Sequence, residues 1–372
     1  MLLPDKTVFA KLLHVQAPFS IAEIRFFDED DHQAVELIMT VDPAYRPLDE
    51  AGQACRLHSY YERRWRHLNL FEYRCYIRSR LPRYQCATGQ VKTLDVPWAR
   101  SGSHFTLLFE QEAMELIEMT SNVAATARRL GLRPQRLWNL FAHYTDHALA
   151  QRQLPKTKRV GLDETSRRRG HDYITVFVDL ETATLLQIEE GKDAATVERF
   201  VESYPYAAEI EEVSLDMSPA FISGVGTHLP QAGLTFDRFH VVRLVSRALR
   251  AARRSKRVCA DAIATVRLFF SQLWESRSVT EAEALLCFVI DFAKEQGLSK
   301  LSKSLRRHFD GIVAYVRTGL TNGLLEGINN KIQSIKRIAR GYRYTETFKR
   351  MIYLCFGSLD LRFDSGRPTT IT

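Results

Sequence analysis

Three acidic residues stand in sequence settings that suit metal-assisted phosphodiester chemistry. Asp163 lies in Val-Gly-Leu-Asp-Glu-Thr-Ser and Asp216 in Val-Ser-Leu-Asp-Met-Ser, so each closes a short apolar run that predicts a buried strand. Glu326, in Gly-Leu-Leu-Glu-Gly-Ile-Asn-Asn-Lys, lies near the start of a predicted helix. Carboxylates placed in this way can converge and hold two divalent cations, which activate a water or a 3′-hydroxyl for in-line attack on a phosphodiester.

The stretch that carries the two aspartates predicts a sheet that would bring them together. Hydrophobic periodicity predicts strands over residues 159–163, 173–180, 184–189, 213–216 and 233–236, and helices over 197–204 and 219–228. Three meandering strands followed by helix, strand, helix and strand is the order of a ribonuclease-H-like sheet. The first and fourth strands are neighbours in that order, so Asp163 and Asp216 are predicted to end side by side. Glu164 is predicted to face the other way because side chains alternate along a strand.

The helix predicted from Gly323 carries Glu326 on a polar face. Its apolar residues recur at helical spacing and predict a buried stripe of Leu324, Leu325, Ile328, Ile332, Ile335 and Ile338. Polar side chains recur in line with Glu326, namely Asn329, Asn330, Gln333, Arg337 and Arg340. Amides and guanidiniums can hold a phosphate backbone beside a metal site. A single glutamate on an amphipathic helix can also be an ordinary exposed residue. Glu326 is therefore a candidate metal ligand only in combination with the two aspartates.

Residues 105–150 have a helical pattern that suits DNA binding. The spacing predicts a helix over 123–130, a turn at Gly131 and a second helix over 135–144 with Pro134 at its first position. This arrangement is typical of a helix-turn-helix. Its second helix is predicted to expose Gln135, Arg136 and Asn139. An ordinary αα-hairpin is the alternative, and the alanine-rich first helix favours DNA binding over it.

Asp237 and His240, in Phe-Asp-Arg-Phe-His-Val-Val, form a further pair next to the predicted sheet. They either cap the following helix or lie at the rim of the site and touch DNA. The capping role is preferred, since a helical and strongly basic segment begins at once after them.

The predicted fold class is α+β with several domains. A β-rich module over 1–103 is followed by a helix-turn-helix region over 104–150 and a catalytic domain over 151–372, which contains an all-α segment at about 241–320. The net charge of +8 is compatible with a nucleic-acid partner and equally with a merely solvated basic face. No Gly-x-Ser-x-Gly or phosphate-loop motif occurs, so a serine hydrolase or an ATPase has no support.

Composition and the first residues also bear on location. No apolar run of about 18 residues occurs, which argues against a transmembrane helix. Asp5 and Lys6 break any apolar segment of the signal-peptide kind, and six scattered cysteines do not make a disulfide framework. The protein is therefore expected to be cytoplasmic, with no membrane partner.

In these features the chain resembles the DDE transposases of bacterial insertion sequences, specifically the ISL3 family. The matching stretches follow the family's order along nearly the whole chain: Trp65–Leu68, Arg74–Tyr76, Val96–Arg100, Gly161–Ser166, Arg169–His171, Val178–Glu181, Ser214–Pro219, Phe236–Val242 and Asn322–Lys331. The resemblance implies an N-terminal zinc-binding module, a helix-turn-helix and a ribonuclease-H-like catalytic domain. It also implies that Asp163, Asp216 and Glu326 bind metal.

Such a protein would bind double-stranded DNA, both the terminal inverted repeats of its element and the target. It would use two Mg²⁺ or Mn²⁺ ions for phosphodiester hydrolysis and strand transfer. A homodimer or larger assembly is expected because two DNA ends must be held at once. The alternatives are a non-catalytic DNA-binding repressor or remnant of a transposase, and a metal-dependent DNA nuclease that cuts without joining.

The chain departs from the family at the expected zinc ligands. Similar proteins carry Cys-x-x-Cys-Gly-x-x-Cys early and Cys-Pro-x-Cys or Cys-Pro-x-His later. Here Leu48, Ala51 and Gly89 occupy ligand positions, which leaves only Cys55 and Cys86. A structural zinc site needs four ligands. Other cysteines and histidines in the module, at spacings that are not a zinc pattern, are Cys75, His58 and His67. The module is predicted to fold without zinc or with a weak remnant site.

Overall fold

The computed structural model describes residues 6–13, 15–29, 32–49, 52–168, 170, 172–255 and 258–363. These residues pack into two compact units. The first contains the described residues up to Phe141 together with Leu361–Phe363, and the second is Ala142–Asp360. The β-rich module and the helix-turn-helix thus belong to one unit, while the three-domain division remains a prediction.

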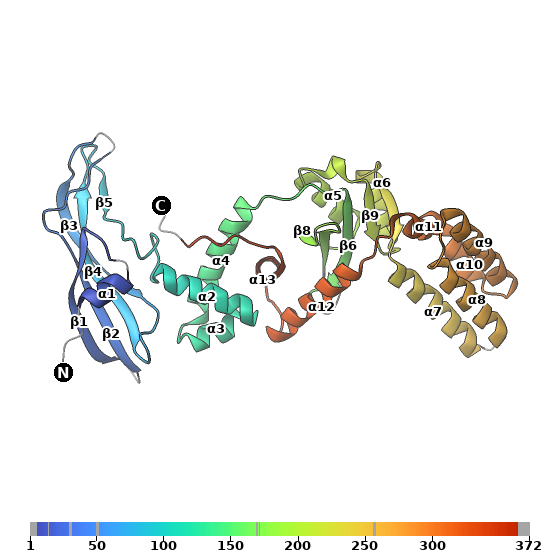
Figure 1. The fold of residues 1–372 in the computed structure, drawn as a ribbon, viewed down its shortest axis with the longest axis horizontal. Coiled ribbons are helices and arrows are strands. Elements are labelled where there is room, and N and C mark those ends of the chain that lie inside the picture. Colours follow the sequence, from blue (N-terminus) through green and yellow to red (C-terminus); the bar gives the residue numbers. More distant parts are fainter. Residues whose placement is uncertain are drawn as a thin grey trace. The chain divides into compact units, whose positions relative to one another are not determined.

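The first unit begins with helix α1 (Lys6–Leu12) and a sheet (Figure 1). The described strands are β1 (Phe19–Glu29), β2 (His32–Val41), β3 (Arg56–Arg66), β4 (Arg74–Gln85) and β5 (Val91–Thr93). They lie in the order β1-β2-β4-β3, with β5 also paired to β4. Only the β2–β4 pair among them is parallel. Leu37, Trp65 and Ile77 form a dry core because alternate residues of these strands face one side.

The helix-turn-helix follows as α2 (Leu107–Thr120), α3 (Val123–Arg129) and α4 (Pro134–Gln151). The side chain of Asn122 caps α3 by accepting the N–H of Ala125 at 3.0 Å. Gly131 has φ +66° in the turn, a conformation that glycine adopts without strain. The predicted second helix begins at Pro134 as expected, but it is longer than predicted, and the division between the two units falls within it.

The second unit contains the predicted sheet. Its described strands are β6 (Arg159–Ser166), β7 (Tyr173–Asp179), β8 (Thr184–Glu190), β9 (Glu212–Leu215) and β10 (Gly233–Phe236), in the order β10-β9-β6-β7-β8. The β6–β7 and β7–β8 pairs are antiparallel, and the β6–β9 and β9–β10 pairs are parallel. Thus β6 and β9 are neighbours, as the strand pattern predicts.

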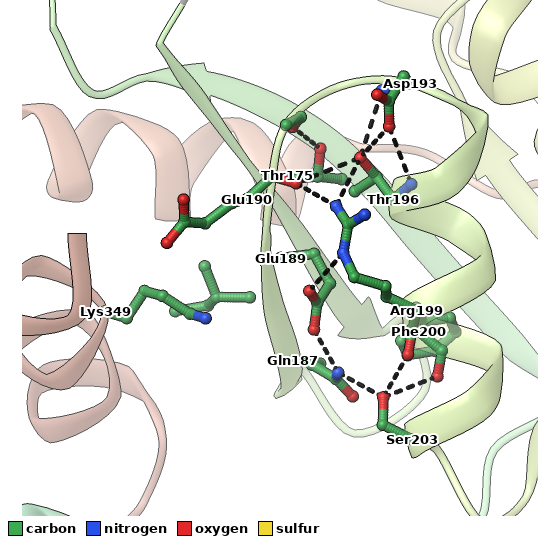
Figure 2. Close-up of polar contacts among 12 residues, drawn as sticks. Thr175, Gln187, Glu189, Glu190, Asp193, Thr196, Arg199, Phe200, Ser203 and Lys349 are labelled. Carbon is green, nitrogen blue, oxygen red and sulfur yellow. Dashed lines mark hydrogen bonds and ion pairs between the residues drawn. The ribbon is translucent and has the colours of Figure 1, made fainter.

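Helices α5 (Ala194–Ser203) and α6 (Pro219–His228) connect these strands. Figure 2 shows how polar contacts fasten α5 to β8. The Asp193 carboxylate accepts the N–H of Thr196 at 3.0 Å and caps the helix. Arg199 forms an ion pair of 3.3 Å with Glu189 and also donates to the carbonyl of Glu190. These contacts hold the helix against the sheet edge that lies away from β9.

Helices make up the rest of the second unit. They are α7 (Arg238–Ser255), α8 (Ala260–Leu273), α9 (Val279–Glu295), α10 (Ser299–Arg307), α11 (Phe309–Thr318), α12 (Gly323–Ile338) and α13 (Thr345–Phe356). The first five form the predicted all-α segment after β10. None of the helices in the described part of the chain is long and apolar enough to cross a membrane.

Candidate active site and DNA-binding elements

The pairing of β6 with β9 sets the two aspartates at equivalent positions. Gly161 is paired with Ser214 in this parallel pair. Asp163 and Asp216 each follow two residues later. Strand β6 does not end at Asp163 as predicted but continues to Ser166, so Asp163 lies within the strand, whereas Asp216 directly follows the end of β9. The structure therefore brings these two predicted site residues together.

Asp163 lies in a confined polar setting. One carboxylate oxygen accepts the N–H of Glu164 at 2.9 Å, and the other accepts the side-chain amide of Asn329 at 2.7 Å. Burial raises the pKa of Asp163 to about 6, and the nearby charges of Glu164 and Asp216 act in the same direction, whereas His240 lowers it. The half-buried Asp216 accepts the N–H of Ser218 at 2.9 Å, just before α6. The negative charge of Asp216 disfavours the ionised form of Asp163, and a cation bound near both carboxylates would relieve this repulsion.

Helix α12 packs beside β6 (Figure 1) and is fastened to it by polar contacts. Besides Asn329, Gln333 donates to the Thr165 hydroxyl at 2.6 Å and Lys336 donates to the carbonyl of Ser166 at 2.6 Å. A Cβ atom at Gly161 would lie 2.6 Å from Leu325 Cδ1, so the glycine leaves the space in which this leucine packs. The helix that carries Glu326 is thus held against the strand that carries Asp163.

The predicted faces of α12 need two corrections, while contact of its polar side chains with DNA stays a prediction. Ile338 is 52% exposed and does not extend the buried stripe. Arg340 lies beyond the end of the helix, with φ +56°, so it does not continue the polar face. The amides of Asn329 and Gln333 bind strand β6, because the helix lies close enough for them to satisfy its polar groups. Asn330 and Arg337 remain exposed.

Glu326 is exposed and lies one helical turn before Asn329. Among the described residues, no three His, Cys, Asp or Glu side chains lie close enough together to hold a metal ion. The structure therefore unites Asp163 with Asp216 but does not complete a three-carboxylate cluster with Glu326. Its role in metal binding stays a prediction.

Glu164 is an acidic neighbour that the strand pattern did not single out. Burial raises the pKa of Glu164, and the charge of Asp216 raises it further. Its Oε2 atom is buried without a hydrogen-bond partner among the described residues. Alternation along β6 predicts only which face of the strand carries the Glu164 side chain. The sequence alone therefore did not indicate that Glu164 interacts with Asp216.

Asp237 and His240 connect three elements near the two aspartates. One carboxylate oxygen of Asp237 lies 3.0 Å from His240 Nδ1, and the other accepts the N–H of Asn322 at 3.2 Å, just before α12. Although burial favours the neutral acid, these hydrogen bonds hold the pKa of Asp237 below its usual range. The pairing with Asp237 raises the pKa of His240. Asp237 thus joins the end of β10 to the starts of α7 and α12, in keeping with the preferred structural role.

A basic cavity adjoins this region. It has a volume of about 1210 Å³, and Asp216 and His240 belong to its lining. Arg243 and Arg247 of α7 and Lys300 of α10 also line it. These two arginines are exposed, and neither forms an ion pair with any residue that the structure describes. In the sequence these two arginines are four residues apart, a spacing that predicts that both lie on one side of α7.

The helix-turn-helix exposes all three predicted side chains, Gln135, Arg136 and Asn139. The Gln135 amide donates to the Asn139 side chain at 3.0 Å, which aligns the two on one face of α4. Their contact with DNA stays a prediction.

At the expected zinc site, the Sγ atoms of Cys55 and Cys86 lie 3.5 Å apart. Of the other ligand positions, Leu48 is 67% exposed, Gly89 has no ligating side chain, and Ala51 lies outside the described residues. Of the ligand positions in the family pattern, only these two thiols remain, and they lie close together. The other candidates in the module have different surroundings, since Cys75 is fully buried and the His67 ring is hydrogen-bonded to Thr106.

Sequence comparisons identify the protein class. The profile of the ISL3 group of DDE transposases, described as "Transposase", matches residues 160–265 and 265–352, more than half of the chain. The chain belongs to the ISL3 family of DDE transposases. A helix-turn-helix domain of the same family matches residues 94–145, and the zinc finger of the transposases of IS204, IS1001, IS1096 and IS1165 matches residues 51–89.

Two curated relatives match over most of their length. The transposase for insertion sequence element IS1557 of Mycobacterium tuberculosis is 25% identical over 414 aligned residues, covering 90% of this chain and 92% of the relative. The transposase for IS1001 of Bordetella parapertussis is 26% identical over 380 residues, covering 88% and 93%. Among solved structures, the catalytic core domain of BIV integrase matches 27% of this chain and 73% of its own, with 13% identity and a TM-score of 0.18.

These findings confirm the predicted function class. The protein is a DNA transposase with a DNA-binding helix-turn-helix, and it is a polynucleotidyl transferase of a family that depends on divalent metal ions. The family assignment does not name the residues of this transposase that act on DNA.

Proposed function

We propose that this transposase binds the terminal inverted repeats of an insertion sequence, hydrolyses the 3′ ends and joins them to target DNA, with Asp163, Asp216 and Glu326 as its metal-binding and catalytic residues. The observation that carries the proposal is the register of β6 and β9, which sets Asp163 and Asp216 side by side. A second support is the hydrogen bond from Asn329 to Asp163, since Asn329 shares a helix with Glu326.

The residues at this site fit Mg²⁺ or Mn²⁺. Both ions prefer hard carboxylate oxygens, and the site offers Asp163 and Asp216 with Glu164 beside them. The raised pKa of Asp163 and the unpartnered oxygen of Glu164 indicate negative charge that the described protein groups do not neutralise. When bound, two such ions would activate the attacking oxygen and stabilise the leaving oxygen.

The protein's own residues position the reactants. Asn329 fixes the orientation of the Asp163 carboxylate, and Asp237 holds the start of α12 in place. Arg243, Arg247 and Lys300 supply cations along the cavity that Asp216 also lines, which suits the phosphates of a DNA strand leading away from the reaction centre.

Two displacements at phosphorus account for the reaction. In the first, a water molecule loses a proton and its oxygen bonds to the scissile phosphorus; the bond from phosphorus to the 3′-oxygen breaks, and the 3′-oxygen takes a proton. In the second, the freed 3′-hydroxyl loses its proton, its oxygen bonds to a target phosphorus, and the target's own 3′-oxygen leaves with a proton. No electron transfer is involved. Because two ends must be joined together, the active form is expected to be a dimer or a larger assembly.

Cleavage of an intact labelled end and strand transfer from a pre-cleaved labelled end, both in Mg²⁺, test the proposal. Wild-type protein is expected to yield joined product. Asp216→Ala should lower cleavage and joining by more than about 100-fold while end binding persists. This loss exceeds the one expected from removing a residue that only hydrogen-bonds to a metal ligand. The matched control is Asp261→Ala, which changes an exposed aspartate in the first turn of α8. Undiminished cleavage by the Asp216 variant would refute the assignment.

The same assays separate the alternatives. Nicks without joined product would indicate a nuclease, and a shifted complex without nicks would indicate a repressor or remnant. The lost ligand positions at Leu48 and Gly89 are the observation that favours a remnant.

We also propose that the N-terminal module folds without zinc, because the two thiols of Cys55 and Cys86 cannot complete a tetrahedral site alone. X-ray fluorescence of the purified full-length protein should show zinc well below one ion per chain, and stoichiometric zinc would contradict the proposal.

A further inference from the structure

A small concavity lies within the first unit, where the β-sheet meets the helix-turn-helix. It has a volume of about 210 Å³. Its lining is dominated by cationic side chains and comprises Arg64, Arg66, Arg74, Tyr76, His104, Gly131, Leu132 and Arg136. Four guanidiniums thus surround a space smaller than the usual pocket for a small organic molecule. The size and the charge together suit one compact anion.

Two of the four arginines are fixed by the protein itself. Arg64 forms ion pairs of 3.0 Å with Glu29 and 2.8 Å with Glu36. Arg66 is only 8% exposed and donates to the carbonyls of His67 at 2.7 Å and Cys75 at 2.9 Å. These two lining arginines are therefore held in place by the protein, and Arg66 as a residue is more than nine-tenths buried.

The other two arginines have no carboxylate partner among the described residues. Arg74 of β4 makes no hydrogen bond or ion pair there, although it feels the charge of Glu29. Arg136 lies over the ring of Phe105 at 4.7 Å and makes no ion pair with a described residue. Neither guanidinium is paired with a carboxylate of the described residues, and the repulsion between Arg74 and Arg66 is one that a bound anion would relieve.

The position of these two side chains connects the concavity to DNA recognition. A Cβ atom at Gly131 would lie 2.9 Å from Arg74 Nη2, so this guanidinium rests against the turn of the helix-turn-helix. Arg136 belongs to the first turn of α4, next to the exposed Gln135. In helix-turn-helix proteins the N-terminal residues of the second helix contact base edges, and phosphate contacts fix the register of that helix.

We propose that this arginine concavity binds one phosphodiester group of the DNA backbone and thereby sets the register of α4 on the terminal repeat. The inference rests on the proposed binding of DNA ends and adds the site that orients the reading helix. Arg74 and Arg136 supply the charge-assisted hydrogen bonds, while the fixed Arg64 and Arg66 also line the concavity. Because this contact is made to the DNA backbone and not to a base, it strengthens binding to every DNA sequence by a similar factor.

The test measures the affinity of full-length protein for a terminal-repeat duplex and for an unrelated duplex of equal length, over roughly 50–300 mM salt. Arg74→Ala is expected to weaken both complexes by a similar factor, about tenfold at the lowest salt, and to reduce the slope of log K against log salt by about 1. Arg74→Lys should recover part of the affinity. The matched control is Arg80→Ala, an exposed arginine of the same strand that lies over Tyr60.

A methylphosphonate scan of the terminal repeat provides the second arm. One neutral linkage is expected to weaken the wild-type complex more than the Arg74→Ala complex, since the variant has already lost Arg74's part of that contact. Equal unfolding temperatures of the two alanine variants would exclude misfolding as the cause of a difference. If wild-type protein does not prefer the terminal repeat, the proposed end binding fails, yet the salt slope still tests the phosphate contact.

Three results would overturn the inference. Arg74→Ala and Arg80→Ala could have the same affinity and slope. The loss in Arg74→Ala could be confined to the terminal repeat, which would indicate base reading. Inorganic pyrophosphate could stabilise the wild type but not Arg74→Ala while DNA affinity stays unchanged, which would indicate a site for free anions only.

Discussion

Replacing Asp163 by Asn should make the metal-free protein more stable while it removes activity. The folded protein holds Asp163 in a buried site next to other acidic groups, which raises its pKa to about 6 from the ordinary 3.8. At neutral pH the carboxylate is nevertheless ionised, so the native state bears a cost that the unfolded chain does not have. A neutral amide removes this cost. If the Asn329 amide turns over, its Oδ1, which is buried without a partner among the described residues, accepts the new N–H in place of the bond that its Nδ2 now donates.

The size of the effect follows from the displaced pKa. Each pKa unit corresponds to 1.36 kcal/mol, so the change from 3.8 to about 6 gives an upper value of about 3 kcal/mol. Asp163 is half-buried, and solvent screening reduces the expected gain to about 1–2 kcal/mol. The sign depends on pH. Above pH 6 the wild type bears the full cost, and as pH falls from 6 towards 4 the carboxyl takes up a proton and the cost disappears.

The assay is urea denaturation of full-length wild type and Asp163→Asn in EDTA, at several pH values from 5 to 8. The difference in unfolding free energy should favour the variant and shrink as pH falls. Added Mg²⁺ should stabilise the wild type through binding and leave the variant unchanged. Glu283→Gln, at an exposed glutamate of α9, is the control and should match the wild type throughout. A wild type more stable than the variant at pH 8, or a difference that does not change with pH, would refute the reasoning.

Three other predictions concern the same unit. In the cleavage assay described above, Glu326→Gln should abolish strand cleavage, whereas Glu164→Gln should leave most of it. The reverse result would make Glu164, not Glu326, the third metal ligand. Asn329→Ala should weaken Mg²⁺ binding by about 10–100-fold in a titration of cleavage rate against metal, because it releases the Asp163 carboxylate. The double variant Arg243→Ala, Arg247→Ala should slow cleavage at saturating DNA and leave end affinity within about twofold; an unchanged rate would remove the basic cavity from the path of the strand.

The sheet of the second unit was predictable because its signals are local and mutually consistent. Apolar runs bounded by polar turns defined all of its described strands, and Pro219–His228 and Gly233–Phe236 match the predicted bounds. The two-residue period of strands and the 3.6-residue period of helices separated the two kinds of element along the chain. Once their sequence was known, the connection rules allowed few arrangements of the strands in the sheet. The neighbouring positions of Asp163 and Asp216 follow from that order alone.

The faces of α12 were less predictable because a helical wheel does not show how closely a helix approaches its neighbour. Asn329 and Gln333 were expected to hold phosphate, yet α12 packs near enough to β6 for both amides to bind the strand. That approach depends on the missing side chain of Gly161, a feature of another element. The raised pKa of Glu164 likewise depends on burial and on the charge of Asp216, an interaction between two strands that alternation along one strand cannot predict.

The N-terminal module offers a physical reason why lost zinc ligands need not unfold it. In a small zinc ribbon the metal replaces a hydrophobic core that the chain is too short to build. Here the long strands β1 to β4 enclose Trp65 and Trp98, whose rings meet edge to face at 5.7 Å, together with Leu37 and Ile77. Cys55 precedes β3 and Cys86 follows β4, so the pair of thiols lies at the end of the sheet. The core can therefore hold the strands together without a metal cross-link, and we expect a chelator to leave the unfolding temperature of this unit unchanged.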